Sequence, residues 1–338
     1  MKKQIKKIAI IVIAILLIIC LGVNIYVDSL LNKMDTSETI NDEEINVYVP
    51  EKKKESNADN VVNFLLVGAD NLDPDNENSW SEERSDVMKV ISLDYTSKTI
   101  KISSLSRDVI VYFPTEGYED FYRFNWAFSY EGSKLCMATI NYNFDLDINK
   151  YVSMSFLGFK SIIDYIGGVD IKLSEQEAAA LSKWSSNTFS DGTNHLNGED
   201  ALRYARLRSI DDDIMRMARQ NIVIKAIVNK LKETDYITLI DIITHCLEYV
   251  HTNLTNDEIK KYVLDAIGFD LNNIETMQYP SDINDSYWND TTSMGGYVLN
   301  DYIYEVERIH RFIYNDEDYE VSQNVKNMNF KIHKVFAN

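Results

Sequence analysis

Five arginines gather in one short window of an otherwise acidic chain. They are Arg203, Arg206, Arg208, Arg216 and Arg219. A guanidinium group offers a planar fork of donors that matches phosphate oxygens, and it stays charged in a partly buried site. The alternative is that these are surface arginines neutralised by the carboxylates of residues 211–213, the usual situation for a single arginine. For the cluster as a whole, we favour an anion-binding site.

The spacing inside this window brings several side chains together. If its second half is helical, Arg216, Arg219 and Gln220 share one face of the helix. Arg206 and Arg208 are two residues apart just after a predicted helix end, so an extended backbone there points both side chains the same way. The window therefore predicts one basic site.

Two further groups of basic and acidic residues lie at the ends of predicted strands. Arg84-Ser85-Asp86 comes just before one strand, and Arg107-Asp108 follows another. Asp70 lies at the end of a third. Ligands of open α/β sheets bind where the loops at strand ends converge. Two carboxylates near a pyrophosphate favour Mg²⁺, a hard ion that bridges phosphate oxygens.

The elements that must position these residues alternate between strands and helices. Apolar runs and alternating patterns predict strands over residues 61–67, 87–93, 100–105, 109–113, 151–156, 169–173 and 274–279. Helical periodicity and capping signals predict helices over residues 124–130, 134–142, 157–166, 198–204, 214–231, 257–267 and 302–314, and one that Ser174 caps. This pattern predicts an α/β fold of mixed α+β type, with a central mixed β-sheet flanked by helices on both faces.

The amino terminus predicts a membrane anchor. A lysine-rich tail, residues 1–7, precedes an apolar run over residues 8–27 that is long enough to span a bilayer. One alternative is a cleaved signal peptide, but no small-residue cleavage site follows the apolar run. The other is a lipoprotein signal at Cys20, but the bulky isoleucines before this cysteine fit such processing poorly. We favour an uncleaved transmembrane helix with a cytoplasmic amino terminus. Residues 28–59 are polar and charge-rich, which predicts a solvated stalk.

Composition narrows the classes of partner. The net charge of −19 argues against nucleic acid or an anionic membrane surface as the main partner, because the long-range field repels both. Three cysteines, one of them in the apolar run, provide no disulfide framework. Trp126, Trp184 and Trp288 have rings that suit sugars, but core packing is the simpler interpretation for each.

Eight short motifs follow one another along the chain. They are Gly68-Ala69-Asp70, Arg84-Ser85-Asp86, Arg107-Asp108, Arg123-Phe124-Asn125-Trp126-Ala127, Gly167-Gly168-Val169, Leu196-Asn197-Gly198-Glu199-Asp200-Ala201-Leu202, Arg206-x-Arg208 and Asp213-x-x-Arg216-x-x-Arg219-Gln220. Taken in this order, they resemble the motifs of the LytR-CpsA-Psr family. An ordered set is far more specific than any one motif. The chain departs from the family at Ser106, where proline is usual, and at Arg123, where lysine is usual.

The resemblance implies an extracytoplasmic enzyme of a Gram-positive-type envelope. Such an enzyme transfers teichoic acid, capsule or a similar glycopolymer from a polyprenyl-pyrophosphate carrier to peptidoglycan. It implies a catalytic domain over residues 60–316, with core motifs over 60–232, followed by a C-terminal tail, residues 317–338, that we expect to be loose. Two other functions use the same residues: binding of polyprenyl phosphates by a regulatory surface protein, and hydrolysis of the pyrophosphate.

Roles carry over by position from the family. The expected metal ligands are Asp70 and Asp86, for Mg²⁺ or its substitute Mn²⁺. The expected ligands of the substrate pyrophosphate are Arg84, Arg107, Arg206, Arg208, Arg216, Arg219 and Gln220. For Arg219, the simpler interpretation is that it supports the site. Asp108 either orients Arg107 or acts as a base, and Asp213 holds Arg206 or Arg208.

Overall fold

The structure is a computed structural model that describes residues 29, 45, 60–69, 84–246, 249–266, 268–282, 286–289 and 295–336. The predicted transmembrane segment, residues 8–27, and Asp70 lie outside these residues. Within the described part of the chain, none of the helices combines the length and the apolar character that crossing a membrane requires. Ile45, which the sequence places in a solvated stalk, is instead fully buried in the main core.

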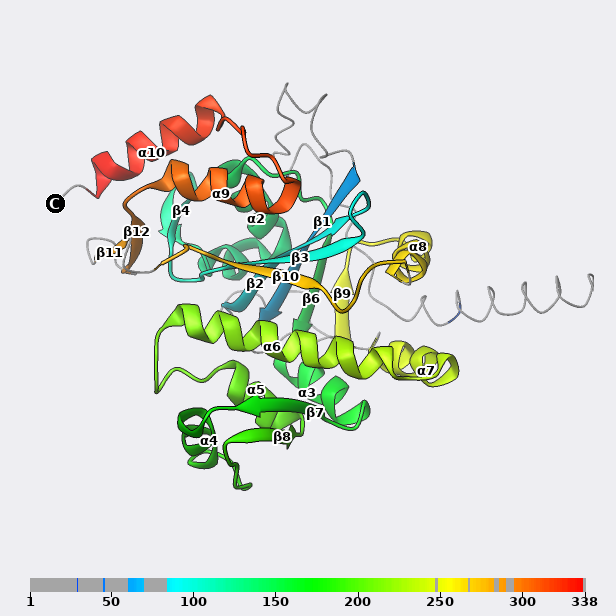
Figure 1. Cartoon of the computed structure of the whole chain (residues 1–338). Helices are drawn as coiled ribbons and strands as arrows, with labels where there is room; N and C mark the ends of the chain where they lie inside the picture. The colour runs from blue at the N-terminus through cyan, green and yellow to red at the C-terminus, as the bar shows by residue number, and fades with distance from the viewer. Residues whose placement is uncertain are drawn as a thin grey trace, which may run out of the picture.

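A mixed sheet of six strands occupies the centre of the molecule, in the order β10-β3-β2-β1-β6-β9 (Figure 1). The strands are β1 (Val61–Ala69), β2 (Ser85–Asp94), β3 (Thr99–Leu105), β6 (Tyr151–Ser155), β9 (Val250–Thr252) and β10 (Ile274–Tyr279). β1 pairs with β6 and β3 with β10 in parallel, whereas β2 runs antiparallel to both β1 and β3. The carboxyl ends of β1, β3, β6 and β10 therefore meet at the edge where β2 begins.

Three small two-stranded sheets accompany the central one in the described part of the chain. They pair β4 (Ile110–Phe113) with β5 (Asp120–Arg123), β7 (Val169–Leu173) with β8 (Gly192–Leu196), and β11 (Ser286–Asn289) with β12 (Gly296–Leu299).

Helices cover the sheet and form the rest of the fold. They are α2 (Trp126–Phe144), α3 (Phe156–Tyr165), α4 (Glu175–Ser182), α5 (Gly198–Ala205), α6 (Asp213–Lys232), α7 (Tyr236–Cys246), α8 (Asn256–Ala266), α9 (Tyr302–Tyr314) and α10 (Gln323–Val335). Figure 1 shows α9 and α10 on one side of the sheet and α6 on the other. The predicted mixed sheet flanked by helices is confirmed.

Successive side chains of β2 point to opposite faces of the central sheet, which explains why the two faces have different neighbours. Val90 joins the main core, which includes α2, α9 and α10, whereas its neighbour Lys89 points the other way and donates to Asn221 on α6. A second, smaller core lies among α3, α4, α5, α6, β7 and β8. The arginine-rich window connects the second core to the sheet.

The structure confirms one local prediction and corrects another. The two helices expected over residues 124–130 and 134–142 are present as the two parts of α2, which a kink separates at Glu131 and Gly132, where the backbone leaves helical geometry. The C-terminal tail is not loose, because α10 buries Val325, Met328 and Ile332 in the main core. Three buried apolar residues at helical spacing, obscured by the polar residues between them, stabilise this segment.

Candidate functional site

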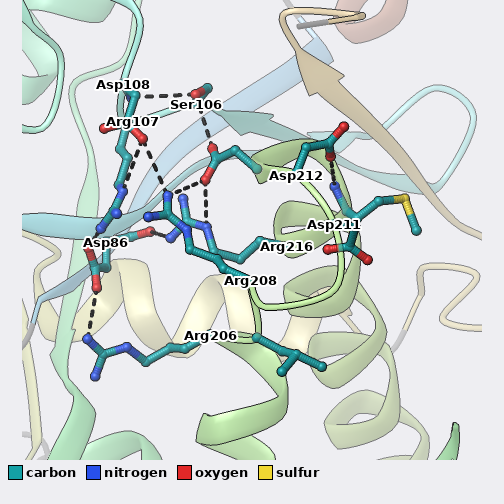
Figure 2. A network of polar contacts seen from close by, with 12 residues as sticks. Asp86, Ser106, Arg107, Asp108, Arg206, Arg208, Asp211, Asp212 and Arg216 are labelled. Atoms are coloured by element: carbon teal, nitrogen blue, oxygen red, sulfur yellow. Dashed lines mark hydrogen bonds and ion pairs between the residues drawn. The ribbon is translucent and has the colours of Figure 1, made fainter. Parts of the chain in front are cut away.

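The arginine-rich window meets the sheet at the edge where β2 begins. Asp86 is the second residue of β2, and Arg107 and Asp108 lie just beyond the end of β3, after Ser106. Arg206 caps the carboxyl end of α5, and Asp213 is the first residue of α6. Figure 2 shows these segments converging, with their charged side chains directed toward one another.

Asp86 gathers three of the predicted arginines. Its carboxylate accepts from Arg107 and, at 3.3 Å, from Nη2 of Arg206. Its backbone carbonyl accepts from Nη1 of Arg216 at 3.0 Å. These donors come from the end of β3, the end of α5 and the second turn of α6, so one acidic residue ties three separate segments together.

Asp108 and Asp213 organise the other side of the cluster. Arg208 donates to Asp108 at 3.3 Å and to Asp213 at 2.5 Å, and so bridges the two carboxylates. Asp213 also accepts from Nε of Arg216 at 2.8 Å. Arg107 Nε lies 3.6 Å from Asp108. The pairing of Asp213 with Arg208 is one of the two contacts expected for it.

Ser106 adds a contact that a proline would lack. It lies immediately after β3, at the position where the family usually has proline, and its hydroxyl donates to Asp213 Oδ2 at 3.1 Å. The departure therefore supplies an additional hydrogen bond that connects the sheet edge to the start of α6.

Burial makes the positive charges of Arg107 and Arg216 costly, which suits the cluster to an anion. Burial, together with the nearby charge of Arg216, lowers the pKa of Arg107 to about 10. Burial likewise lowers the pKa of Arg216, although Asp213 partly opposes the shift. Cations that their own carboxylates do not fully compensate gain free energy when an anion binds between them. Arg206 and Arg208 remain about two-fifths exposed, so a ligand can reach them.

Arg219 differs from these arginines in its partners. Its side chain is 2% exposed and donates to Glu177 at 2.9 Å, to Asp211, and to the carbonyl of Leu207 at 2.8 Å. Burial opposes its charge, but the bonds to Asp211 and Glu177 raise its pKa. Its donors therefore hold the loop before α6 rather than face the cluster, which agrees with a supporting role.

The remaining predicted residues lie around the cluster. Gln220 is buried on α6, one turn after Arg216. The guanidinium carbon of Arg84 lies 4.5 Å from the ring centroid of Trp126, so Arg84 stacks on an aromatic ring instead of joining the network around Asp86. Asp70 lies outside the described residues, although Ala69 before it pairs with Ser85, the residue before Asp86.

Three residues near the cluster were not among those expected to bind the metal or the pyrophosphate. Arg123 lies 3.5 Å from Asp108 and donates from Nε to the carbonyl of Gly295 at 2.7 Å. Phe156 lies under Arg206, with 4.6 Å between its ring centroid and the guanidinium carbon. Tyr297 donates its backbone N–H to the carbonyl of Asp108 at 2.8 Å. The motif around Arg123 was a usable signal, whereas nothing local marks Tyr297.

A buried lysine lies beneath the cluster. Lys89 is fully buried and donates to Ser104 Oγ at 2.7 Å and to Asn221 Oδ1 at 2.8 Å. Burial and the nearby charge of Arg216 lower the pKa of Lys89 to about 7.

The donor set can be compared with the needs of a divalent cation. In the described part of the chain, no three or more His, Cys, Asp or Glu side chains come together as a metal-binding group. Asp86 supplies hard carboxylate oxygens at the sheet edge, and Mg²⁺ is commonly held by one or two carboxylates plus substrate phosphates. Of the two carboxylates expected to hold the metal, Asp86 is therefore the described one that could contribute oxygens to Mg²⁺.

The LytR_cpsA_psr family model matches residues 23–308. The chain belongs to this family. Among LytR_cpsA_psr relatives, "Polyisoprenyl-teichoic acid--peptidoglycan teichoic acid transferase TagU" of Bacillus anthracis is 29% identical over 291 residues, which cover 82% of this chain and 88% of that protein. The TagU of Enterococcus faecalis is 30% identical over 261 residues, covering 76% and 80% respectively.

A solved structure of the family shares the fold. TagV of B. subtilis superimposes with a TM-score of 0.61 and 26% sequence identity, covering 77% of this chain and 98% of TagV. The recognition of a LytR-CpsA-Psr protein from its ordered motifs is therefore confirmed.

Proposed function

We propose that this chain transfers a glycopolymer, such as teichoic acid or a capsule polymer, from a polyprenyl-pyrophosphate carrier to a hydroxyl of peptidoglycan. The observation that carries the proposal is the meeting of Arg107, Arg206, Arg208 and Arg216 around the carboxylates at one edge of the sheet. Membership of a family whose relatives are named as teichoic acid transferases supports it.

The cluster suits a pyrophosphate better than a single small anion. Its donors come from both sides of Asp86 and Asp108 and project from four places in the chain. A planar guanidinium binds two phosphate oxygens at once, and several together stabilise charge that spreads over the equatorial and bridging oxygens during transfer. When the substrate binds, its phosphates replace carboxylates as the partners of the exposed Arg206 and Arg208.

The reaction is an in-line displacement at the phosphorus that carries the glycan. An acceptor hydroxyl, expected to be that at C6 of N-acetylmuramic acid, forms the new P–O bond. The P–O bond to the polyprenyl phosphate breaks, and the polyprenyl phosphate leaves with its negative charge. The hydroxyl proton passes to a carboxylate or to solvent. Arg107, Arg123 and Arg208 surround Asp108, an arrangement that favours an orienting role for this carboxylate over that of a base.

We propose Mg²⁺, with Mn²⁺ as a substitute, as the cofactor. Asp86 and Asp70 are its expected protein ligands, and the bound ion would neutralise charge on the phosphate oxygens. Binding of Mn²⁺ alone, and then with inorganic pyrophosphate, followed by electron paramagnetic resonance, tests this directly. Asp86→Asn is expected to weaken the binding of Mn²⁺ in both cases. Equal binding by wild type and variant would remove Asp86 from the ion's ligands.

We further propose that residues 8–27 anchor the protein in the cell membrane with the amino terminus in the cytoplasm and the catalytic domain outside. Lysines before the apolar run and none within it support this orientation. Protease added to intact protoplasts is expected to digest residues 60–316 and to leave an amino-terminal tag protected. Protection of both parts would place the domain inside the cell.

A labelled lipid-linked glycan tests the function. The full chain is incubated with this donor, with and without peptidoglycan, and the label is followed. Label on peptidoglycan identifies a transferase. Free phosphorylated glycan, formed equally without peptidoglycan, identifies a hydrolase, and donor that is bound but unchanged identifies a binding protein. Only the first outcome supports the proposal.

A further inference from the structure

A surface cavity of about 450 Å³ adjoins the arginine cluster on the side of α4 and α5. Leu181 and Trp184 contribute apolar surface to it, and Glu199 and Arg203 contribute charged groups. Its volume falls within the range of about 300–1,000 Å³ that is typical of small-molecule sites, as does this mixture of apolar surface with a few polar groups.

The cavity is continuous with the proposed transfer site. Arg206 and Arg208 both line it. The guanidinium groups of these two residues lie 3.3 Å from Asp86 and 2.5 Å from Asp213, inside the cluster. A molecule in the cavity therefore lies beside the groups that we propose hold the phosphates.

Trp184 is the most exposed large side chain of this wall. The sequence favours core packing for Trp184, and this prediction is wrong, because 67% of the residue is exposed. Single exposed apolar residues are common and need no explanation by themselves. This one differs because it lines a cavity beside charged groups.

Hydrogen bonds fix the backbone that carries Trp184. Its N–H donates to the carbonyl of Leu181 at 3.1 Å at the end of α4, and its carbonyl accepts from Arg203 on α5. The next residue, Ser185, donates from its hydroxyl to the buried carboxylate of Asp200 at 2.6 Å. Because this backbone is fixed, a ligand that stacks on the exposed indole has only the side-chain torsions of Trp184 left to order.

The polar groups of the cavity match a hydroxyl-rich ligand. Glu199 accepts from Arg203 at 2.9 Å and from Lys160 at 3.2 Å, and its side chain is still 48% exposed. A carboxylate oxygen accepts from sugar hydroxyls, and a guanidinium donates to hydroxyl and acetamido oxygens. A pyranose ring presents an apolar C–H face to an indole and hydroxyls at its rim, whereas a prenyl chain makes no use of such a charged pair.

We infer that this cavity is a pyranose-binding subsite in which a sugar of the peptidoglycan acceptor stacks on Trp184. The inference rests on the proposed function and deepens it. A sugar held there would present a hydroxyl to phosphorus bound by Arg206 and Arg208. The donor also carries pyranose units, so the test must separate the two substrates.

Acceptor kinetics provide the first arm of the test. Transfer rates of the full chain are measured against the concentration of uncross-linked peptidoglycan strands at saturating donor, and then against donor at saturating strands. Trp184→Ala is expected to raise the KM for the strands roughly tenfold, the equivalent of about 1.4 kcal/mol. Trp184→Phe should recover most of the loss, and Phe330→Ala, at an exposed aromatic residue on α10, is the matched control. An increase confined to the donor KM, or no change in either KM, would overturn the assignment to the acceptor.

Direct binding provides an arm that does not depend on turnover. A β-1,4-linked tetramer of N-acetylglucosamine is titrated calorimetrically into wild type and into the same three variants. Loss of binding in Trp184→Ala alone supports the subsite, even if the wild type transfers no glycan and the proposed function fails. Equal binding by wild type and Trp184→Ala, or no binding by either protein, overturns the subsite while leaving the proposed function to its own test.

Discussion

Arg206 Nη2 lies 3.3 Å from Asp86 Oδ2, although 120 residues separate the two along the chain. Asp86 lies near the start of a strand of the central sheet, whereas Arg206 caps the end of a helix of the smaller core. The contact therefore exists only when the two parts of the fold are packed together. It places an exposed guanidinium over the edge where the ends of four strands meet.

Arg206→Ala is expected to reduce the transfer rate by about 10²–10³-fold, the usual effect of removing one preorganised donor. Arg206→Lys should recover only part of the rate, because an ammonium group cannot bind two oxygens in a fork. Initial rates with labelled lipid-linked glycan and peptidoglycan provide the measurement. The control is Arg311→Ala, at a half-exposed arginine of α9 that pairs with Glu317, and this variant should transfer at the wild-type rate. A rate for Arg206→Ala close to that of Arg311→Ala would contradict the role of Arg206.

Arg219→Ala is expected mainly to lower the free energy of unfolding. The substitution leaves Glu177 and Asp211 without their shared buried partner, and breaking a buried ion pair typically costs about 3–5 kcal/mol. Urea unfolding of Arg219→Ala and Arg206→Ala, compared at pH 7, separates the two roles. Arg219→Ala should lower the free energy of unfolding by far more than Arg206→Ala. Equal stabilities, together with a loss of activity only in Arg219→Ala, would instead make Arg219 a ligand of the substrate.

Asp213→Asn is expected to remove a contribution to stability that depends on pH. Burial disfavours the charged carboxylate, but Arg216 and Arg208 hold the pKa of Asp213 below its ordinary value. The stabilisation by this carboxylate is therefore fully present above the unfolded pKa of about 3.9 and is lost as pH falls through the folded pKa. The variant should be less stable than wild type at pH 7, by on the order of 3 kcal/mol, with the difference shrinking below about pH 4. A difference that stays constant with pH would show that the charge of Asp213 does not stabilise the fold.

The sequence predicted the parts of this site that depend on local pattern. Arg216 and Gln220 share a helix because their spacing fits one helical face, and Asp86 and Arg107 lie at strand ends because apolar runs reveal the strands. The stacking of Arg84 on Trp126 was not predictable in this way, because only the tertiary fold brings the ring under the guanidinium group. The same holds for Tyr297, which reaches Asp108 from a strand late in the chain.

Two misjudged regions have physical reasons. The helix α10 carries Val325, Met328 and Ile332 between polar residues, so its mean hydropathy resembles that of a tail while its buried face does not. Trp184 belongs to a residue type that is mostly buried, and sequence pattern carries no information about a cavity formed by neighbouring helices. Sequence thus revealed the chemistry of the cluster better than the surface around it.

Lys89→Met is expected to flatten the dependence of stability on pH above neutrality. Burial lowers the pKa of Lys89 to about 7, against about 10.4 in the unfolded chain. Below pH 7 both states hold the proton, and the folded state bears the full cost of a buried charge. As pH rises above 7 the folded protein loses this proton while the unfolded chain keeps it, so the stability of the wild type gains up to about 1.4 kcal/mol per pH unit from this group.

The free energies of unfolding in urea are measured for both proteins from pH 7 to 9. Titration of Cys136 and Cys246 is common to both proteins, so the difference between the curves isolates Lys89. Wild type should gain on the variant as pH rises, and parallel curves would mean that Lys89 keeps its proton, held by Ser104 and Asn221, throughout this range.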